Sequence, residues 1–89
     1  MLDKTPQTKS GFELEEIDGE LLLYSPSSTR SVYMNSTASI IWRLCDGNQN
    51  VAEIIELLKE AFPEAADKIE QDVVDSISLF KENGAIELV

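Results

Sequence analysis

The sequence predicts a small α+β domain with winged-helix-like packing, in which a three-stranded antiparallel sheet is followed by three helices. In the first third of the chain, residues 12–15 alternate apolar and polar side chains, and the dipeptide Asp18-Gly19 separates them from a second apolar run. From Asn35 onward, apolar residues recur at helical spacing instead. Two glycines, Gly47 and Gly84, follow such stretches at positions typical of helix ends. The 89 residues are enough for one domain of this kind.

The first two strands are predicted to form a hairpin. Residues 12–15 alternate as a half-buried strand does, and a second apolar run covers Glu20–Tyr24. Asp18-Gly19 favours a two-residue type I′ turn, because both of its positions need a positive φ. Folding about this turn pairs Leu14 with Leu23. The residues that then share the core face are Phe12, Leu14, Leu21 and Leu23, and those on the opposite face are Glu13, Glu15, Leu22 and Tyr24.

A short third strand is expected at Arg30–Met34, after a polar loop at residues 25–29. Val32 and Met34 would face one side of this strand and Tyr33 the other. It is the last strand before the helices. If it lies at the edge of the sheet, it offers unpaired backbone N–H and C=O groups to another chain.

The first helix is expected to begin at Asn35 or Ser36, since either side chain can accept a hydrogen bond from a free backbone N–H. Its predicted core face consists of Ala38, Ile41, Trp42 and Cys45, which are spaced i, i+3, i+4, i+7. We expect Ile41 and Trp42 to be buried. Gly47 is expected to end this helix as its C′ residue.

Two more helices follow. Asn50 and Glu53 form a capping-box pattern, and Phe62-Pro63 ends the second helix. Its expected core positions are Val51, Ile54, Leu57, Leu58 and Ala61. The third helix is predicted from about residue 65 to residue 83, with a core stripe of Ile69, Val73, Ile77 and Phe80. Residues 85–89 would form a short extended segment. Residues 1–10 show no periodicity, so they are predicted to be a flexible tail preceding a domain at residues 11–89.

The composition excludes several classes of function. With 17 acidic and 7 basic residues the formal charge is −10, which repels nucleic-acid phosphates and anionic membranes. This charge either serves solubility alone or also steers a basic peptide segment towards the protein. No apolar run is long enough to span a membrane, and the N-terminus has no secretory h-region, so a cytoplasmic location is expected.

No set of residues suggests catalysis, a metal or a cofactor. The chain has no histidine, and its single cysteine, Cys45, lies in an apolar helix stripe, where a buried and inert thiol is expected. The neighbouring acids Asp72 and Asp75 lack calcium-ligand spacing, and helix-surface carboxylates usually face water. The triplet Asp75-Ser76-Ile77 resembles the phosphopantetheine attachment site of acyl carrier proteins. There, however, the attachment serine opens a helix, whereas Ser76 is expected in the middle of one.

One stretch of the chain carries a family resemblance. Its parts, in order, are Met34-Asn35-Ser36-Thr37-Ala38, Ile41-Trp42, Leu44, Asp46-Gly47 and Glu53-Ile54. With Asp72-Val73 and Gly84 added, the pattern resembles that of the coenzyme PQQ synthesis protein D family over about residues 12–88. These are small leader-peptide-binding domains of ribosomal peptide modification. The chain departs from the pattern at Met34, where leucine is expected, and at Ser76-Ile77, where two large apolar residues are more usual.

The resemblance implies an adaptor without catalytic activity. Such a protein holds the leader of a ribosomally made precursor peptide and presents it to a modifying enzyme, often of the radical SAM class. The leader would add as an antiparallel strand along Arg30, Ser31, Val32, Tyr33 and Met34, with its side chains in a groove beside the third helix.

The helical wheel offers two candidate flanks for the groove. The first is Asp72, Ser76, Leu79 and Asn83, and it combines a small residue with an apolar one. The second is Glu70, Val74 and Lys81. The sequence favours the first flank on composition and does not decide which flank meets the strand. Two other functions stay open: an interaction domain that forms a homodimer through the same strand edge, and a carrier protein modified at Ser76.

Overall fold

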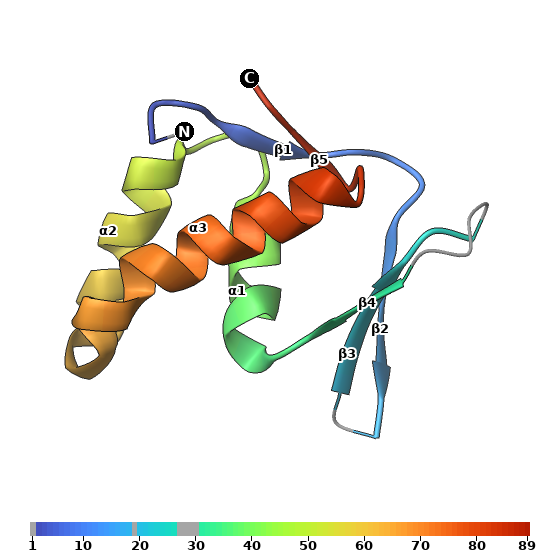
Figure 1. Ribbon diagram of the computed structural model, residues 1–89, viewed down its shortest axis with the longest axis horizontal. Helices are drawn as coiled ribbons and strands as arrows, with labels where there is room; N and C mark the ends of the chain where they lie inside the picture. The colour runs from blue at the N-terminus through green and yellow to red at the C-terminus, as the bar shows by residue number, and fades with distance from the viewer. Residues whose placement is uncertain (1, 19, 27–30) are drawn as a thin grey trace.

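The computed structural model describes residues 2–18, 20–26 and 31–89, and it confirms the predicted α+β class. A three-stranded sheet lies to one side of three helices, and a two-strand ribbon crosses the end of the molecule above them (Figure 1). The elements in order are β1 (Pro6–Thr8), β2 (Glu13–Ile17), β3 (Glu20–Tyr24), β4 (Ser31–Met34), α1 (Ser36–Leu44), α2 (Val51–Ala61), the 3-10 turn η1 (Pro63–Ala65), α3 (Ala66–Glu82) and β5 (Ile86–Leu88).

The sheet has the strand order β2-β3-β4 and is antiparallel throughout. Its register pairs Leu14 with Leu23, as the predicted hairpin requires, and it also pairs Leu23 with Val32 of β4. Asp18 has φ 52°, in agreement with the expected turn, whereas Gly19 lies outside the described residues. Leu23 is fully buried, and the other residues of the predicted core face, Phe12, Leu14 and Leu21, pack against the core.

Asn35 is the residue that caps α1, since its Oδ1 accepts from the backbone N–H of Ala38 at 2.8 Å. The helix ends earlier than expected. Its C-cap is Cys45, so Gly47 lies beyond the C′ position and forms part of the following turn with φ 83°. There the Gly47 N–H donates to the Pro6 carbonyl at 3.1 Å. The N-terminal strand β1 thus contacts the turn after α1.

The capping box at the start of α2 is present in full, with Asn50 and Glu53 each accepting from the other's backbone N–H at 2.8 Å. The helix ends at the predicted Phe62-Pro63 step. Its buried face differs in part from the predicted one. The buried residues are Val51, Ile54, Ile55 and Leu58, whereas Leu57 is 43% exposed and Ala61 is also exposed.

The long helix α3 packs against both α1 and α2 and closes the core. The four residues of its predicted core stripe are buried: Ile69, Val73, Ile77 and Phe80. They form one cluster with the inward residues of β3 and β4 and with Ile41 and Ile54 of the other helices. Gly84 follows the C-cap with φ 74°, the left-handed conformation of a C′ glycine.

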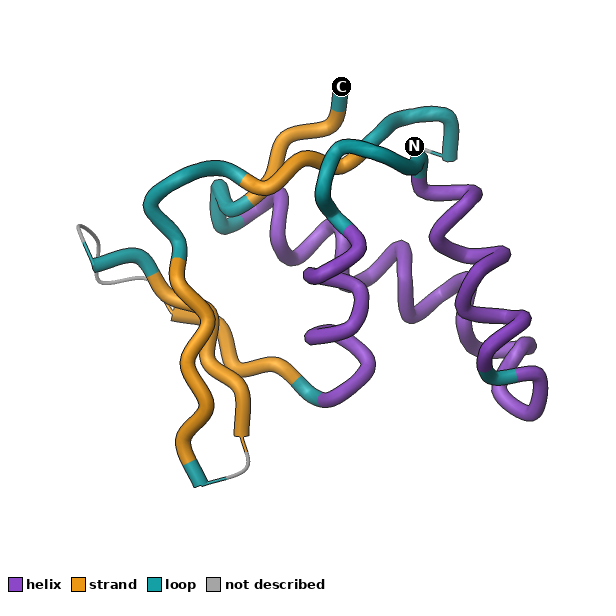
Figure 2. Tube along the Cα trace, turned by 180° about the vertical axis from the view of Figure 1, so that it is seen from behind, coloured by secondary structure: helices purple, strands orange, loops and turns teal. Residues whose placement is uncertain are grey.

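Within the segment that the sequence predicted to be a flexible tail, Pro6–Thr8 form the strand β1. This strand pairs antiparallel with β5, the extended segment at the C-terminus. The backbone N–H groups of Val51 and Ala52 also donate to the carbonyls of Lys4 and Leu2. Figure 2 shows the resulting ribbon along one end of the helices. Main-chain bonds, which a side-chain pattern does not reveal, attach this segment to the rest of the fold.

Candidate functional site

Strand β4 forms one edge of the sheet. Within the described residues it pairs with β3 alone, so its other side presents backbone N–H and C=O groups. Val32 and Met34 are buried, while Tyr33 is 73% exposed, which confirms the predicted alternation. Arg30, the first residue of the predicted strand, lies outside the described residues.

The two edges of the sheet differ in charge. The opposite edge, β2, carries Glu13, Glu15 and Glu16, and the Tyr24 hydroxyl donates to Glu13 Oε2 at 2.8 Å. This hydrogen bond raises the pKa of Tyr24, with smaller contributions from desolvation and from the charges of Glu13 and Glu15. The β4 sequence Ser-Val-Tyr-Met has no charged residue. Since charges on an edge strand discourage pairing, β4 is the edge better suited to accept another strand.

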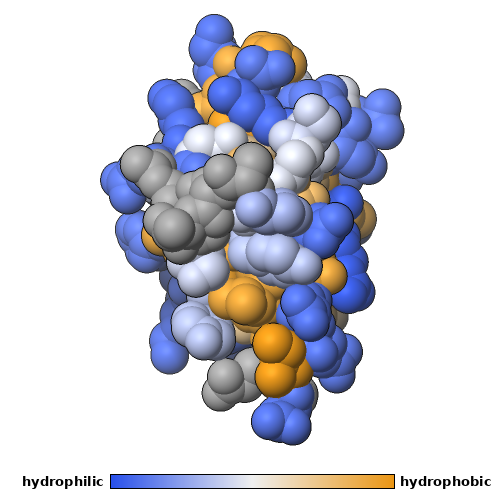
Figure 3. Space-filling model, turned by 90° about the vertical axis from the view of Figure 1, so that its right-hand side faces the viewer, coloured by the Kyte–Doolittle hydropathy of each residue, from blue (hydrophilic) through white to orange (hydrophobic). Residues whose placement is uncertain are grey.

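On the outer face of the sheet, Glu15, Leu22 and Tyr33 lie in one cross-strand row. Leu22 is half-buried and Tyr33 is largely exposed. Figure 3 faces this side of the molecule and shows hydrophobic surface among hydrophilic surroundings. A strand added at β4 would extend the row by one position and place a side chain beside Tyr33.

A polar hollow of about 240 Å³ lies where β4 leads into α1. The residues that line this polar hollow are Asn35, Thr37, Asp72, Asp75 and Ser76. Two residues of the first predicted flank, Asp72 and Ser76, thus lie opposite the end of β4. The other two do not line the hollow: Leu79 is 38% exposed, and Asn83 is the C-cap of α3, where its side-chain nitrogen donates to the Leu79 carbonyl at 2.9 Å.

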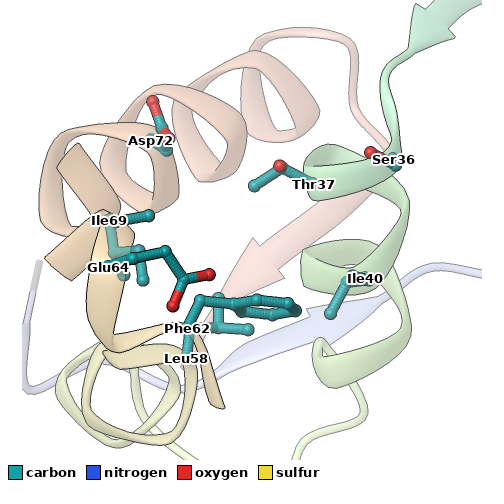
Figure 4. Close-up of a pocket in the computed structure, with 9 residues that line it drawn as sticks. Ser36, Thr37, Ile40, Leu58, Phe62, Glu64, Ile69 and Asp72 are labelled. Atoms are coloured by element: carbon teal, nitrogen blue, oxygen red, sulfur yellow. The ribbon is translucent and has the colours of Figure 1, made fainter. Parts of the chain in front are cut away.

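The structure also contains an apolar pocket that sequence reasoning missed. It has a volume of about 200 Å³ and lies between α1, the end of α2, η1 and α3. The residues that line this apolar pocket are Ser36, Thr37, Ile40, Leu58, Phe62, Glu64, Ala65, Ile69 and Asp72. Figure 4 shows the Phe62 ring and the Ile40 side chain directed towards each other, with the Glu64 carboxylate beside the ring.

The sequence holds a signal for this pocket that was interpreted only as a helix end. Phe62 is the C-cap of α2 and continues its buried stripe, since it follows Leu58 by four residues and Ile55 by seven. Phe62 is 41% exposed. Its ring carries this apolar face past the end of the helix and forms part of the pocket wall.

Cys45 and Ser76, the two candidate nucleophiles, both lie in surroundings that favour a structural role over a reactive one. Cys45 is fully buried and its Sγ donates to the Ile41 carbonyl at 3.2 Å. Burial, and secondarily the charge of Asp46, raises the pKa of the Cys45 thiol to about 12, so the reactive thiolate is not formed near neutral pH. Ser76 lies within α3 and not at its start, unlike the attachment serine of a carrier protein.

Among the residues that the structure describes, no three His, Cys, Asp or Glu side chains come together in a way that could hold a metal ion. No helix there has the length and apolar character needed to cross a membrane.

Comparison with known proteins gives one consistent family. The model of the family "Coenzyme PQQ synthesis protein D (PqqD)" matches residues 20–86. A "PqqA binding protein" of Azotobacter vinelandii is 32% identical over 90 residues, which cover 98% of this chain and 94% of the relative. Proteins of the same name from Pseudomonas aeruginosa (33% identical, 82% of this chain and 78% of the relative) and Klebsiella pneumoniae (36% identical, 70% and 63%) also match.

No solved structure matches the chain significantly. The family match spans β3, β4 and all three helices, and so includes the edge strand, the polar hollow and the apolar pocket. The sheet-then-helices order is the one that the resemblance of the sequence implied. This chain belongs to the coenzyme PQQ synthesis protein D family.

Proposed function

We propose that this chain is a non-catalytic adaptor that binds the leader of a ribosomally made precursor peptide and presents it to a modifying enzyme. The observation that carries the proposal is the uncharged edge strand β4, which ends beside the polar hollow on α3. Family membership and the name of the relatives, "PqqA binding protein", support it. A radical SAM enzyme is the proposed recipient, and the cytoplasm, where ribosomes make the precursor, is the proposed location.

In the proposed complex the leader adds to β4 as an antiparallel fourth strand of the sheet. Hydrogen bonds between main chains supply affinity without regard to sequence. Alternate side chains of the leader would lie beside Tyr33 on the outer face and towards α3 on the inner face. The proposed contacts on the protein are Arg30, Ser31, Val32, Tyr33, Met34, Asp72, Ser76, Leu79 and Asn83. Specificity would come from the α3 side, where Asp72 and Ser76 line the hollow.

The test is an NMR titration of the labelled protein with a synthetic leader of the precursor encoded beside its gene. Chemical-shift changes are expected to cluster at residues 31–34 and 72–83.

Proline at Val32 or at Tyr33 removes one backbone donor, and only one of the two N–H groups points away from β3. That variant should bind at least about tenfold more weakly while staying folded, because an edge position tolerates proline. The other variant should lose stability instead.

Leu79→Lys should weaken binding by about three- to tenfold, because a charge on this flank disturbs side-chain contacts and leaves the backbone pairing intact. Val74→Lys is the matched control, since it adds the same charge on the opposite flank of α3. Shifts confined to the β2–β3 hairpin or to α2 would contradict the proposal. Sedimentation at several protein concentrations distinguishes the alternative, in which β4 pairs with a second copy.

A further inference from the structure

The polar hollow and the apolar pocket are adjacent, because Thr37 and Asp72 line both. Together they form a path along the surface. The path begins at Asn35, the residue that follows β4, and leads past the first turn of α1 to Phe62. It is therefore continuous with the end of the edge strand proposed to bind the leader.

The charges along this path have one sign. Asp72 and Asp75 line the hollow, Asp72 and Glu64 line the pocket, and neither lining contains a lysine or arginine. The floor of the pocket is apolar, formed by Ile40, Leu58, Phe62, Ala65 and Ile69. Its volume of about 200 Å³ suits one large side chain and is below the range of sites for drug-sized ligands. A complementary occupant has an apolar side chain next to a basic one.

Chain direction decides which part of a leader reaches this path. A strand antiparallel to β4 has its N-terminal end beside Met34 and its C-terminal end beside Ser31. Residues that precede the paired segment therefore leave the sheet next to Asn35, where the hollow opens. Going back along the leader from the paired segment, its residues meet the hollow first and the pocket second.

We infer that the leader carries a second recognition element on the N-terminal side of its paired strand. It consists of an apolar side chain that fills the apolar pocket, followed by a lysine or arginine held near Asp72, Asp75 and Glu64. This inference rests on the proposed function for the direction of the peptide. The pocket chemistry itself does not depend on strand addition and can be tested apart from it.

The probe for this test is N-acetyl-leucyl-lysine amide, with the glutamine and glutamate analogues as matched controls of similar shape. Methyl NMR on the full chain follows Ile40, Leu58 and Ile69. The lysine peptide should shift these methyl signals and bind about two- to fivefold more tightly than the glutamine peptide, with the glutamate peptide weakest. Equal affinities for the three peptides, or shifts elsewhere on the surface, would overturn the inference.

Protein variants separate charge from pocket shape. Asp72→Asn combined with Glu64→Gln should abolish the preference for lysine, while Glu70→Gln on the opposite flank of α3 should keep it. Phe62→Ala should weaken all three peptides, since it removes part of the apolar wall. If the leader shifts β4 but no dipeptide shifts the pocket, this inference fails and the proposed function stands. If the dipeptides bind and the leader leaves β4 unshifted, strand addition fails instead.

Discussion

At the scale of single residues, Trp42 shows how a small domain limits burial. Its indole meets the Phe80 ring edge-on, with ring centroids 5.3 Å apart and an interplanar angle of 79°. Ile41 is fully buried as expected, whereas Trp42 is only partly buried. A side chain as large as tryptophan is rarely covered completely, least of all in a domain of 89 residues.

Trp42→Ala should therefore lower the free energy of unfolding by about 2–3 kcal/mol, less than the ~3–5 kcal/mol typical of a fully buried aromatic residue. The loss combines apolar area with the edge-on contact to Phe80. Urea unfolding followed by circular dichroism measures it. Tyr33→Ala, at an exposed position, is the control and should change stability by about 0.5 kcal/mol or less. A loss below about 1 kcal/mol for Trp42→Ala would show that the ring contributes little to packing.

Part of the candidate site was predictable at this scale and part was not. The alternation of Val32, Tyr33 and Met34 follows from the period of two in a strand, and the structure confirms it. To predict that Asp72 lies opposite the end of β4, one must know the angle between α3 and the sheet. The spacing of apolar residues in the sequence does not give that angle. The pocket at Phe62 was missed because residues from four separate elements form it.

At the scale of elements, the sequence predicted best what is decided locally. Capping at Asn35 and Asn50 depends on side chains within three residues, and the structure shows both caps. The sequence determined the buried face of α2 less clearly. The apolar residues of this helix fit two overlapping stripes, one with Leu57 and Ala61 and one with Ile55. Packing against α3 selects the second stripe, and helix geometry alone does not.

The β1–β5 ribbon was not predicted for a different reason. Each of its strands has three residues, which is too short for an alternating pattern. Its stability comes from main-chain hydrogen bonds, such as the pair between Thr5 and Val89 at 2.9 and 3.0 Å, and from the buried ring of Pro6. Further bonds join Thr8 to Cys45 and Lys9 to Ala85. Because these are main-chain contacts, they depend on how the chain folds and not on the residue types that make them.

Deletion of residues 2–8 tests whether this ribbon stabilises the protein. We expect a loss of about 2–4 kcal/mol, because several hydrogen bonds at about 0.5–1.5 kcal/mol each and the burial of Pro6 outweigh the entropy that the segment regains. Thermal and urea unfolding give the measurement. Replacement of the same residues by a glycine-serine segment of equal length is the control for chain length. An unchanged unfolding midpoint after the deletion would show that the segment contributes no stability and behaves as a flexible tail.

At the scale of the whole molecule, the ribbon and the edge strand lie on different sides. β1 and β5 run across one end of the helices, whereas β4 leads into α1 at the opposite end of that helix (Figures 1 and 2). The end of β4 beside the polar hollow is thus separated by the length of α1 from the turn that contacts β1. Stability and peptide binding can then be altered separately, which makes the variants of β4 and of β1 independent tests.

The net charge of −10 should act on the rate of peptide association more than on the final contacts. If a basic segment of the leader is drawn to the acidic path at Asp72 and Glu64, the association rate should fall about threefold or more between 50 and 300 mM salt. The dissociation rate should change less, because main-chain hydrogen bonds in the added strand are weakly screened.

Stopped-flow fluorescence of a labelled leader measures both rates. A leader whose basic residues are replaced by glutamine is the control, and its association rate should be nearly independent of salt. Equal salt dependence for the two peptides would show that the charge serves solubility alone.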